Sequence, residues 1–271
     1  MKLIESKVEV IEQQPGLDGV YKQIELAGRT CYKSEDKITE DSAKAFVDRM
    51  IKSKHGAMLE HGTVYLSVPK EETEIIGFHG WCQYSKVRSD LVMEEPCNWL
   101  ITTNMRVLVE HDRLSDLKYI CEPTERHAKR ITARFACDRG VSHEIVRHRV
   151  MSFAMESQRY VGYDKEKFGG EITFIKPHWY NEEFPACLTW VESLKDAEQK
   201  YMDLREAGLK PQDARGVLPN ATKTEIVVTG FESDWEHFFS LRSPKYGAQG
   251  AHPDIAKLAD ELYEKLNSVN K

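Results

Sequence analysis

The 271-residue sequence lacks the features that mark several large classes of protein. No apolar run reaches about eighteen residues, the length that a membrane-spanning helix needs. Residues 1–16 lack the long apolar core of a signal peptide. The six cysteines include no CxxC pair, so neither a disulfide framework nor a zinc site is favoured. We therefore expect a soluble, cytoplasmic protein with reduced thiols and no membrane partner.

An excess of positive charge is also missing. The chain has 38 Lys and Arg against 44 Asp and Glu, which gives a formal net charge of −6. Binding to nucleic acid usually needs a basic surface, so we expect no nucleic-acid partner. The glycine-rich phosphate loops GxGxxG and GxxxxGKS/T are both absent, which argues against Rossmann and P-loop folds. Any anion site must therefore be local.

The hydrophobic pattern predicts a mixture of strands and helices without a regular βαβ repeat. Hydrophobic residues make up 41% of the chain, enough for a sizeable core. We expect strands near residues 2–12, 63–68, 131–138, 171–177 and 222–230. We expect helices near residues 17–32, 39–56, 139–149, 182–208, 212–219 and 232–242 and from 254. The fold class predicted is α+β: one domain, residues 1–271, with a largely antiparallel sheet flanked by helices and an elaborated segment at about 69–125.

Positive charge gathers in one segment, "RHRVMSFAMESQRY", residues 147–160. Successive residues of a helix point about 100° apart, so Arg147, His148 and Arg149 cannot all serve one helix face. Either they contact different groups or they lie where the helix ends. Arginine presents a planar fork of donors that suits phosphate, and Arg159 adds a third guanidinium. The alternative is a solvated basic helix end, as most charged runs are.

Metal binding finds little support in the histidine spacing. His143 and His148 are five residues apart, whereas the helical zinc motif needs four to place both rings on one face. Glu60 and His61, just before a predicted strand, are typical of a structural pair. The sequence therefore predicts no metal site.

Four ordered motifs carry a resemblance to a known family. "RHRVMSFAMES" fits R-H-R, any seven residues, then S, and "SQRY" continues it. "HGAMLEH" (55–61) lies upstream, and "ARGVLP" (214–219) and "HFFSLR" with "AQ" (237–242 and 248–249) lie downstream. Together they resemble the flavin-dependent thymidylate synthases over roughly two hundred residues.

The resemblance implies that family's fold and reaction. In the family, deoxyuridine monophosphate (dUMP) becomes thymidine monophosphate (dTMP). Methylenetetrahydrofolate supplies the carbon, reduced FAD supplies the hydride, and NADPH reduces the flavin. The resemblance also implies a homotetramer whose active sites are shared between subunits, so arginines that point in several directions can serve different ligands and neighbouring chains.

The resemblance also implies roles for individual residues. The positions that match FAD-contacting residues are His55, Arg147, His148, Arg149 and His237. The positions that match dUMP-contacting residues are Glu144, Ser157, Gln158, Arg159, Arg215 and Arg242. We expect Arg242 and Ser157 at the reaction: Arg242 stabilises charge that develops on the uracil oxygens, and Ser157 is a binding donor rather than a nucleophile, since no base adjoins it in sequence.

The chain also departs from the family pattern at five positions: Ala57, Ala154, Met155, Phe231 and Ser233. These positions commonly hold polar residues in the family, so FAD binding or docking can differ here; one interpretation has Phe231 stacking on the adenine. They leave open a second hypothesis, a divergent nucleotide- or flavin-binding homologue without methylation activity. A third, an RNA-binding or structural module built on the arginines, fits the acidic chain less well.

Overall fold

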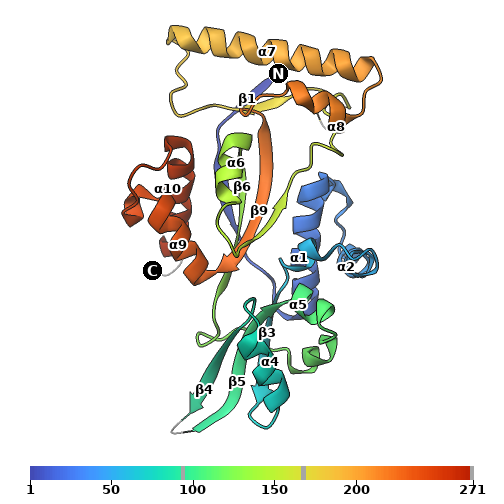
Figure 1. Cartoon of the computed structure of the whole chain (residues 1–271), viewed down its shortest axis with the longest axis vertical. Helices are drawn as coiled ribbons and strands as arrows, with labels where there is room; N and C mark the ends of the chain where they lie inside the picture. The colour runs from blue at the N-terminus through green and yellow to red at the C-terminus, as the bar shows by residue number, and fades with distance from the viewer. Residues whose placement is uncertain (93–94, 166–168, 269–271) are drawn as a thin grey trace.

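The computed structural model describes residues 1–92, 95–165 and 169–268, and the side chains of these residues except 90–97. A four-stranded antiparallel sheet lies at its centre (Figure 1). The strands, in spatial order, are β2 (Lys7–Ile11), β6 (Arg130–Asp138), β9 (Lys223–Phe231) and β7 (Ser152–Met155). Thr229 of β9 lies opposite both Thr132 of β6 and Ser152 of β7.

Both faces of this sheet are covered, because its strands alternate between two hydrophobic cores. Phe135, Ile226 and Val228 enter one core, which the helices on that face close. Ala154 and Val227 enter the other core. The first face carries α6 (Arg139–Ile145), α9 (Glu232–Arg242) and α10 (Pro253–Ser268), and the second carries α1 (Gly16–Tyr32), backed by α2 (Ser42–Lys52) and α3 (Gly56–Leu59).

The segment at 69–125 forms most of a second antiparallel sheet below the first (Figure 1). Its strands, in spatial order, are β3 (Thr63–Pro69), β5 (Glu95–Asn104) and β4 (Lys86–Val92). The helices α4 (Thr73–Trp81), α5 (Met105–Glu110) and the 3-10 turn η2 (Leu114–Tyr119) belong to the same segment. Leu66 and Ile101 of this sheet share a core with α1, so the elaboration is packed onto the centre of the fold.

A third layer lies at the other end. Strands β1 (Lys2–Ile4) and β8 (Thr173–Ile175) pair in parallel, and the long helix α7 (Pro185–Glu206) lies across them (Figure 1). The short α8 (Pro211–Ala214) and η4 (Arg215–Val217) connect α7 to β9. Phe174, Leu194 and Tyr201 form the core of this layer. The described residues also form the 3-10 turns η1 (Glu35–Lys37) and η5 (Pro244–Tyr246).

The predicted class, α+β with antiparallel sheets flanked by helices, is confirmed, with three corrections. The strands described form three sheets rather than one. The first predicted strand is two strands in different sheets, because β1 pairs with β8 while β2 pairs with β6. The helix predicted over 139–149 ends at Ile145, and the chain then enters β7.

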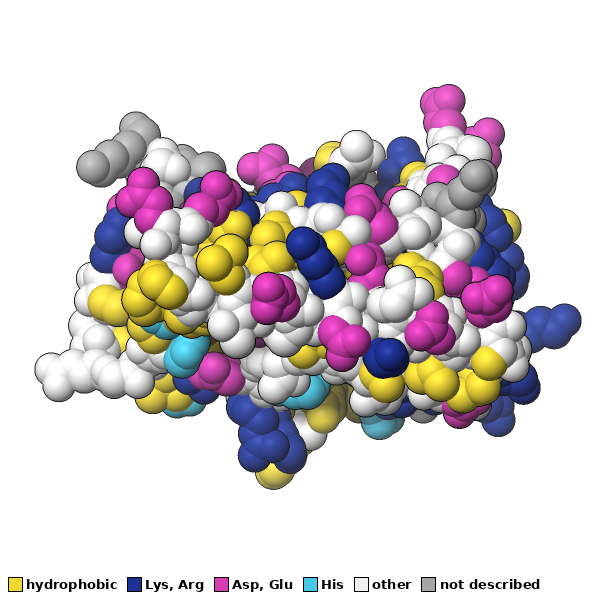
Figure 2. Space-filling model, turned by 90° about the horizontal axis from the view of Figure 1, so that it is seen from above, with side chains coloured by type: hydrophobic (Ala, Val, Ile, Leu, Met, Phe, Trp, Pro, Cys, Tyr) yellow, Lys and Arg dark blue, Asp and Glu magenta, His cyan; other side chains and the backbone are white. Residues whose placement is uncertain are grey.

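Surface charge agrees with the modest net charge. Acidic and basic side chains are interspersed, with hydrophobic ones between them, on the face shown in Figure 2. Across the described ranges we find no helix that combines the length and the hydropathy needed to cross a membrane.

Candidate functional site

Residues 147–160, which we call the signature segment, begin in the turn after α6. The carboxylate of Asp138 accepts a hydrogen bond from the Val141 backbone N–H at 2.8 Å and so caps this helix. Past Ile145, short-range backbone bonds turn the chain, among them Arg149 N–H to the Arg147 carbonyl at 3.1 Å. The side chains of Arg147 and Arg149 are exposed, while His148 between them is buried. The three therefore lie where the helix ends and meet different surroundings.

Four of the predicted residues meet between α6 and α9. We call Glu144, His148, His237 and Arg242 the α6–α9 cluster. Arg242, in the last turn of α9, donates from Nη1 to Glu144 Oε2 at 2.5 Å and from Nε to His148 Nε2 at 3.3 Å. The His148 ring lies 6.2 Å from that of His237, centroid to centroid.

His148 is neutral in this cluster near neutral pH. Burial, and then the positive charge of Arg242 and the neighbouring His237, lower the pKa of His148 from 6.5 to about 4. An uncharged Nε2 that accepts from Arg242 places the ring proton on Nδ1. Arg242 is thus oriented by one carboxylate and one neutral acceptor.

The second half of the signature forms a separate group beside the end of α1. We call residues 157–160 (Ser157, Gln158, Arg159 and Tyr160) the 157–160 cluster. The Ser157 backbone N–H donates to the Cys31 carbonyl at 2.9 Å, and the Tyr160 ring lies 5.6 Å from that of Tyr32. Tyr32 in turn lies 6.2 Å from the His55 ring. His55 therefore belongs to the surroundings of this cluster.

Two buried polar atoms in this region lack a hydrogen-bond partner among the described residues. Nδ1 of His55 and Nε2 of Gln158 are both buried and form no hydrogen bond in the described part of the structure. A buried donor or acceptor without a partner costs about 1–3 kcal/mol. Such atoms are expected where a ligand supplies the missing bond.

Three arginines of the signature also lack acidic partners. Within the described ranges, Arg147, Arg149 and Arg159 form no ion pair, and the Arg159 guanidinium lies 5.4 Å from the centroid of the Tyr160 ring in a cation–π contact. Since acids outnumber bases in this chain, unpaired guanidinium groups in one segment indicate an anionic ligand or a partner chain.

Arg215 lies apart from these arginines, in η4. Its Nε donates to the Gln212 carbonyl at 3.2 Å, so the backbone of α8 orients it. Ala214 shares a core with Val161 and Tyr163, which follow Arg159 in the chain. The turn that carries Arg215 therefore packs on the loop after the 157–160 cluster.

The structure groups the predicted residues differently from the two ligand sets expected. Glu144 and Arg242, expected at dUMP, lie with His148 and His237, expected at FAD. His55, expected at FAD, lies beside the 157–160 cluster. The clusters stand at opposite ends of β7, whose four residues span about 13 Å. Arg242 therefore lies in a different cluster from Arg159.

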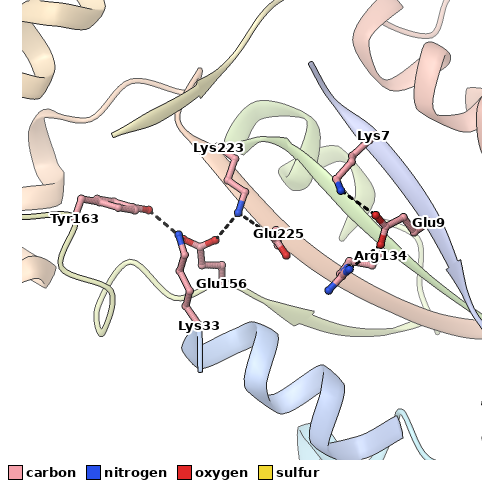
Figure 3. Close-up of polar contacts among 8 residues, drawn as sticks. All are labelled: Lys7, Glu9, Lys33, Arg134, Glu156, Tyr163, Lys223 and Glu225. Atoms are coloured by element: carbon pink, nitrogen blue, oxygen red, sulfur yellow. Dashed lines mark hydrogen bonds and ion pairs between the residues drawn. The ribbon is translucent and has the colours of Figure 1, made fainter. Parts of the chain in front are cut away.

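The side chain of Glu156, next to Ser157, is buried in a polar network (Figure 3). Lys223 Nζ lies 3.2 Å from one of its oxygens, and Lys33 Nζ of α1 lies 3.9 Å from the other. Tyr163 donates its hydroxyl to Glu156 at 3.4 Å, and Lys223 also bonds Glu225. Burial opposes the charge on Lys223, but Glu156 and Glu225 outweigh it, so its pKa is raised above 10.5. This network fixes the start of the 157–160 cluster.

At the five positions that depart from the family pattern, the side chains contact other residues of this chain. Ala154 is buried in the core beneath α1, and Met155 packs on the opposite core. Phe231 is 7% exposed and lies between Lys86 and Arg130, at 4.5 and 5.5 Å from its ring centroid. Its ring is thus already covered by this chain, contrary to the interpretation that it stacks on an adenine. Ser233 accepts from Lys86, and Ala57 is half-buried in α3.

His61 has the structural role expected of it. It is fully buried and its Nδ1 bonds Thr229 Oγ1 at 2.9 Å. Burial, with Arg130 nearby, lowers the pKa of His61 to about 3. A neutral ring there ties α3 to the central sheet.

A cavity of about 600 Å³ lies elsewhere, between residues 10–16 and 120–132. None of the predicted site residues is among its described lining residues. Sequence reasoning did not assign roles to Tyr32, Lys33 and Lys223, because their contacts join segments far apart in the chain. Of these contacts, only the one between Lys223 and Glu225 could have been predicted, because residues two apart on a strand lie on the same face.

Comparison with known proteins places the chain in a family. Residues 124–270 match the family described as "Thymidylate synthase complementing protein". The flavin-dependent thymidylate synthase of Thermococcus kodakarensis is 33% identical over 150 residues, 55% of this chain and 59% of that protein. That of Pyrococcus horikoshii is 36% identical over the same shares, and that of Mycobacterium tuberculosis is 36% identical over 48% of this chain and 54% of its own.

The chain thus spans less than two thirds of the curated relatives it matches. A solved structure of a UMP/dUMP methylase from Streptomyces cacaoi, bound with 5-Br dUMP, aligns with 99% of this chain and 93% of its own, with a TM-score of 0.47 and 17% identity. The family match covers more than half of the chain, including β6, the signature segment, β9 and α9, which build both clusters. The chain belongs to the thymidylate synthase complementing protein family.

Proposed function

We propose that the protein is a flavin-dependent thymidylate synthase that converts dUMP to dTMP, with methylenetetrahydrofolate as carbon donor and NADPH as reductant of a bound FAD. The observation that carries the proposal is the set of unpaired guanidinium groups in the signature segment of an acidic chain. The names of the relatives support the same reaction. The single-domain assignment for residues 1–271 is part of this proposal.

The residues present fit a flavin dinucleotide. Arg147 and Arg149 are exposed and without acidic partners in the described chain, as phosphate-binding residues must be. The buried Nδ1 of His55 lacks a hydrogen bond that a ligand can supply. With His148 and His237 they would hold FAD, which when bound supplies the hydride.

The 157–160 cluster suits a nucleotide monophosphate. Arg159 has a free guanidinium fork for a nearly dianionic phosphate, and Arg215 lies on the turn packed against the following loop. Gln158 Nε2 is a buried donor without a partner in the described structure, and the amide can bond a base edge or a phosphate oxygen. Ser157 adds a hydroxyl, and we assign it binding rather than covalent chemistry.

Arg242 is the residue proposed to stabilise the reaction. Glu144 and the neutral His148 hold its guanidinium in place before any ligand binds. A positioned donor in a site closed to water stabilises charge developing on uracil oxygens without reorganising. Glu144 also offers an acceptor for the uracil N–H.

The separation of the clusters supports a shared active site. If one chain presents the α6–α9 cluster and the 157–160 cluster at opposite ends of β7, each needs complementary residues from elsewhere. We propose that neighbouring subunits of a homotetramer supply them. Sedimentation equilibrium of the purified protein measures the assembly directly, and a monomer at the concentration that supports turnover contradicts it.

Flavin binding and tritium release test the proposal together. The purified protein should show flavin absorption, or acquire it on adding FAD, and should release tritium from dUMP labelled at uracil C5 only when folate, NADPH and FAD are all present. Arg149→Gln should lower FAD affinity, whereas Arg49→Gln, an exposed arginine outside the motifs, should not. A protein that binds neither FAD nor dUMP rules the proposal out.

The second candidate is a homologue that binds nucleotide and flavin without methylating. The apolar Ala154 and Met155, both committed to cores, favour it. Binding of both ligands without tritium release would select this function over the first.

A further inference from the structure

A group of three metal-ligating side chains lies outside both clusters. His178 follows β8, whereas His252 and Asp254 lie at the start of α10. One ligand atom from each residue lies within 4.8 Å of the other two. None of the three matches a motif that indicated the proposed function, so the group is independent of that function.

The distances within the group suit a tetrahedral ion. Asp254 Oδ1 lies 3.3 Å from His178 Nδ1, and Asp254 Oδ2 lies 3.7 Å from His252 Nδ1. Zinc binds imidazole nitrogen and carboxylate oxygen at about 2.0–2.2 Å, so the edge of a tetrahedron of such ligands is about 3.3–3.6 Å. The separation from His178 matches that edge, and the separation from His252, which is to the other oxygen of the same carboxylate, is slightly longer. A water molecule would complete the tetrahedron.

The surroundings hold the carboxylate and leave the rings accessible. The His178 backbone N–H donates to Asp254 Oδ1 at 2.7 Å, which fixes the acid as an outer-shell bond does at metal sites. The side chain of Asp254 is 15% exposed, but those of His178 and His252 are 39% and 54% exposed, so an ion can enter from solvent. His252 Nδ1 accepts only a long 3.4 Å bond from the Asp254 N–H, which a metal bond would replace.

Nearby charge also favours a cation. Asp138 lies close enough for Asp254 to act on it: burial first, and then the charge of Asp254, raise the pKa of Asp138. A divalent ion beside Asp254 would offset this repulsion between carboxylates. No Lys or Arg is ion-paired with Asp254 in the part of the chain described.

We propose that His178, His252 and Asp254 bind a divalent transition metal ion of the zinc class. Two imidazoles and a carboxylate suit Zn²⁺ better than Mg²⁺ or Ca²⁺, which prefer oxygen ligands. The ion joins the loop after β8 to the start of α10, segments 74 residues apart by their numbers, 178 and 252. Its role is structural, because it fastens α10 to the layer that contains α7.

Calorimetry with Zn²⁺ on EDTA-treated, dialysed full-length protein tests the site. We expect about one ion per chain at this site, a higher melting temperature with Zn²⁺, and at least about tenfold weaker binding in His252→Ala and Asp254→Asn. His143→Ala, which removes another exposed histidine, is the matched control and should bind as the wild type does. Circular dichroism tests whether each variant is folded. If one of them is not, His178→Gln is measured in its place.

Co²⁺ distinguishes this site from the thiols. The described cysteines are free, so one of them can bind zinc by itself. Absorption of the Co²⁺ complex without a thiolate charge-transfer band supports the His–His–Asp site. A thiolate band, unchanged affinity in His252→Ala, or no Zn²⁺ binding by the wild type overturns the proposal.

Discussion

Replacing Lys223 by Met removes the central cation of the network around Glu156. The change keeps an aliphatic side chain in a site where Lys223 is 11% exposed, and so isolates the loss of charge. It leaves the carboxylate of Glu156, 2% exposed, with Tyr163 at 3.4 Å and the more exposed Lys33 at 3.9 Å. Glu225 is 26% exposed and can recover water in place of the lost partner.

The expected loss follows from that buried charge. Removing one partner of a buried ion pair costs about 3–5 kcal/mol. Because Tyr163 and Lys33 remain, we expect the lower end, about 3 kcal/mol of unfolding free energy at pH 7. In the wild type, the raised pKa of Lys223 means that its contribution is intact below pH 10.5 and is lost as pH rises through the folded-state pKa.

Urea unfolding followed by circular dichroism measures the effect. The double variant Lys223→Met with Glu156→Gln should recover part of the loss, because the uncompensated charge is gone. Lys257→Met is the matched control: Lys257 pairs with Glu5 at 3.0 Å on the surface, 52% exposed, and its loss should cost less than about 1 kcal/mol. If Lys223→Met costs no more than this control at pH 7, the reasoning about Glu156 is wrong.

Three further predictions concern the two clusters. The depressed pKa of His148 means that its contribution to stability is present above pH 6.5 and is lost as pH falls through about 4. In His148→Gln, the change in unfolding free energy between these pH values should be smaller by at most about 3 kcal/mol. An unchanged pH profile of the unfolding free energy contradicts this role of His148. Arg159→Lys keeps the charge but loses the planar fork, so calorimetry should show dUMP affinity at least about tenfold weaker, whereas unchanged affinity removes Arg159 from the site. Ser157→Ala should reduce turnover or binding without abolishing activity, and complete loss with dUMP affinity intact would reveal a nucleophile.

Local signals predicted much of the fold because they act within one element. The helix that ends near Gly208 and the cap at Asp138 follow from residue type and spacing. The helix predicted over 139–149 was too long because its end depends on tertiary contacts. Beyond Ile145 the chain gains more by pairing residues 152–155 with β9 than by continuing as a helix, and no local pattern shows that β9 is available.

Sequence motifs supplied the residues proposed for the site, but not their grouping. The motifs identified Arg242 and His148, but their hydrogen bond joins residues 94 apart in number. Likewise, His55 was assigned by position in a motif, whereas its neighbourhood is set by Tyr32 at the end of α1. Grouping depends on how helices pack across the sheet, which single-chain patterns do not encode.

Strand β7 fixes the spacing and orientation of the side chains within residues 147–160. Its alternation sends Phe153 and Met155 to one core and Ala154 to the other, while its two flanks hold His148 and Ser157. Inserting or deleting a single residue there would reverse which side chains face each core and would rotate the following serine away from α1. The pleated backbone therefore fixes the interval of seven residues between Arg149 and Ser157. Whether that number is odd or even matters as much as the identity of the residues inside the interval.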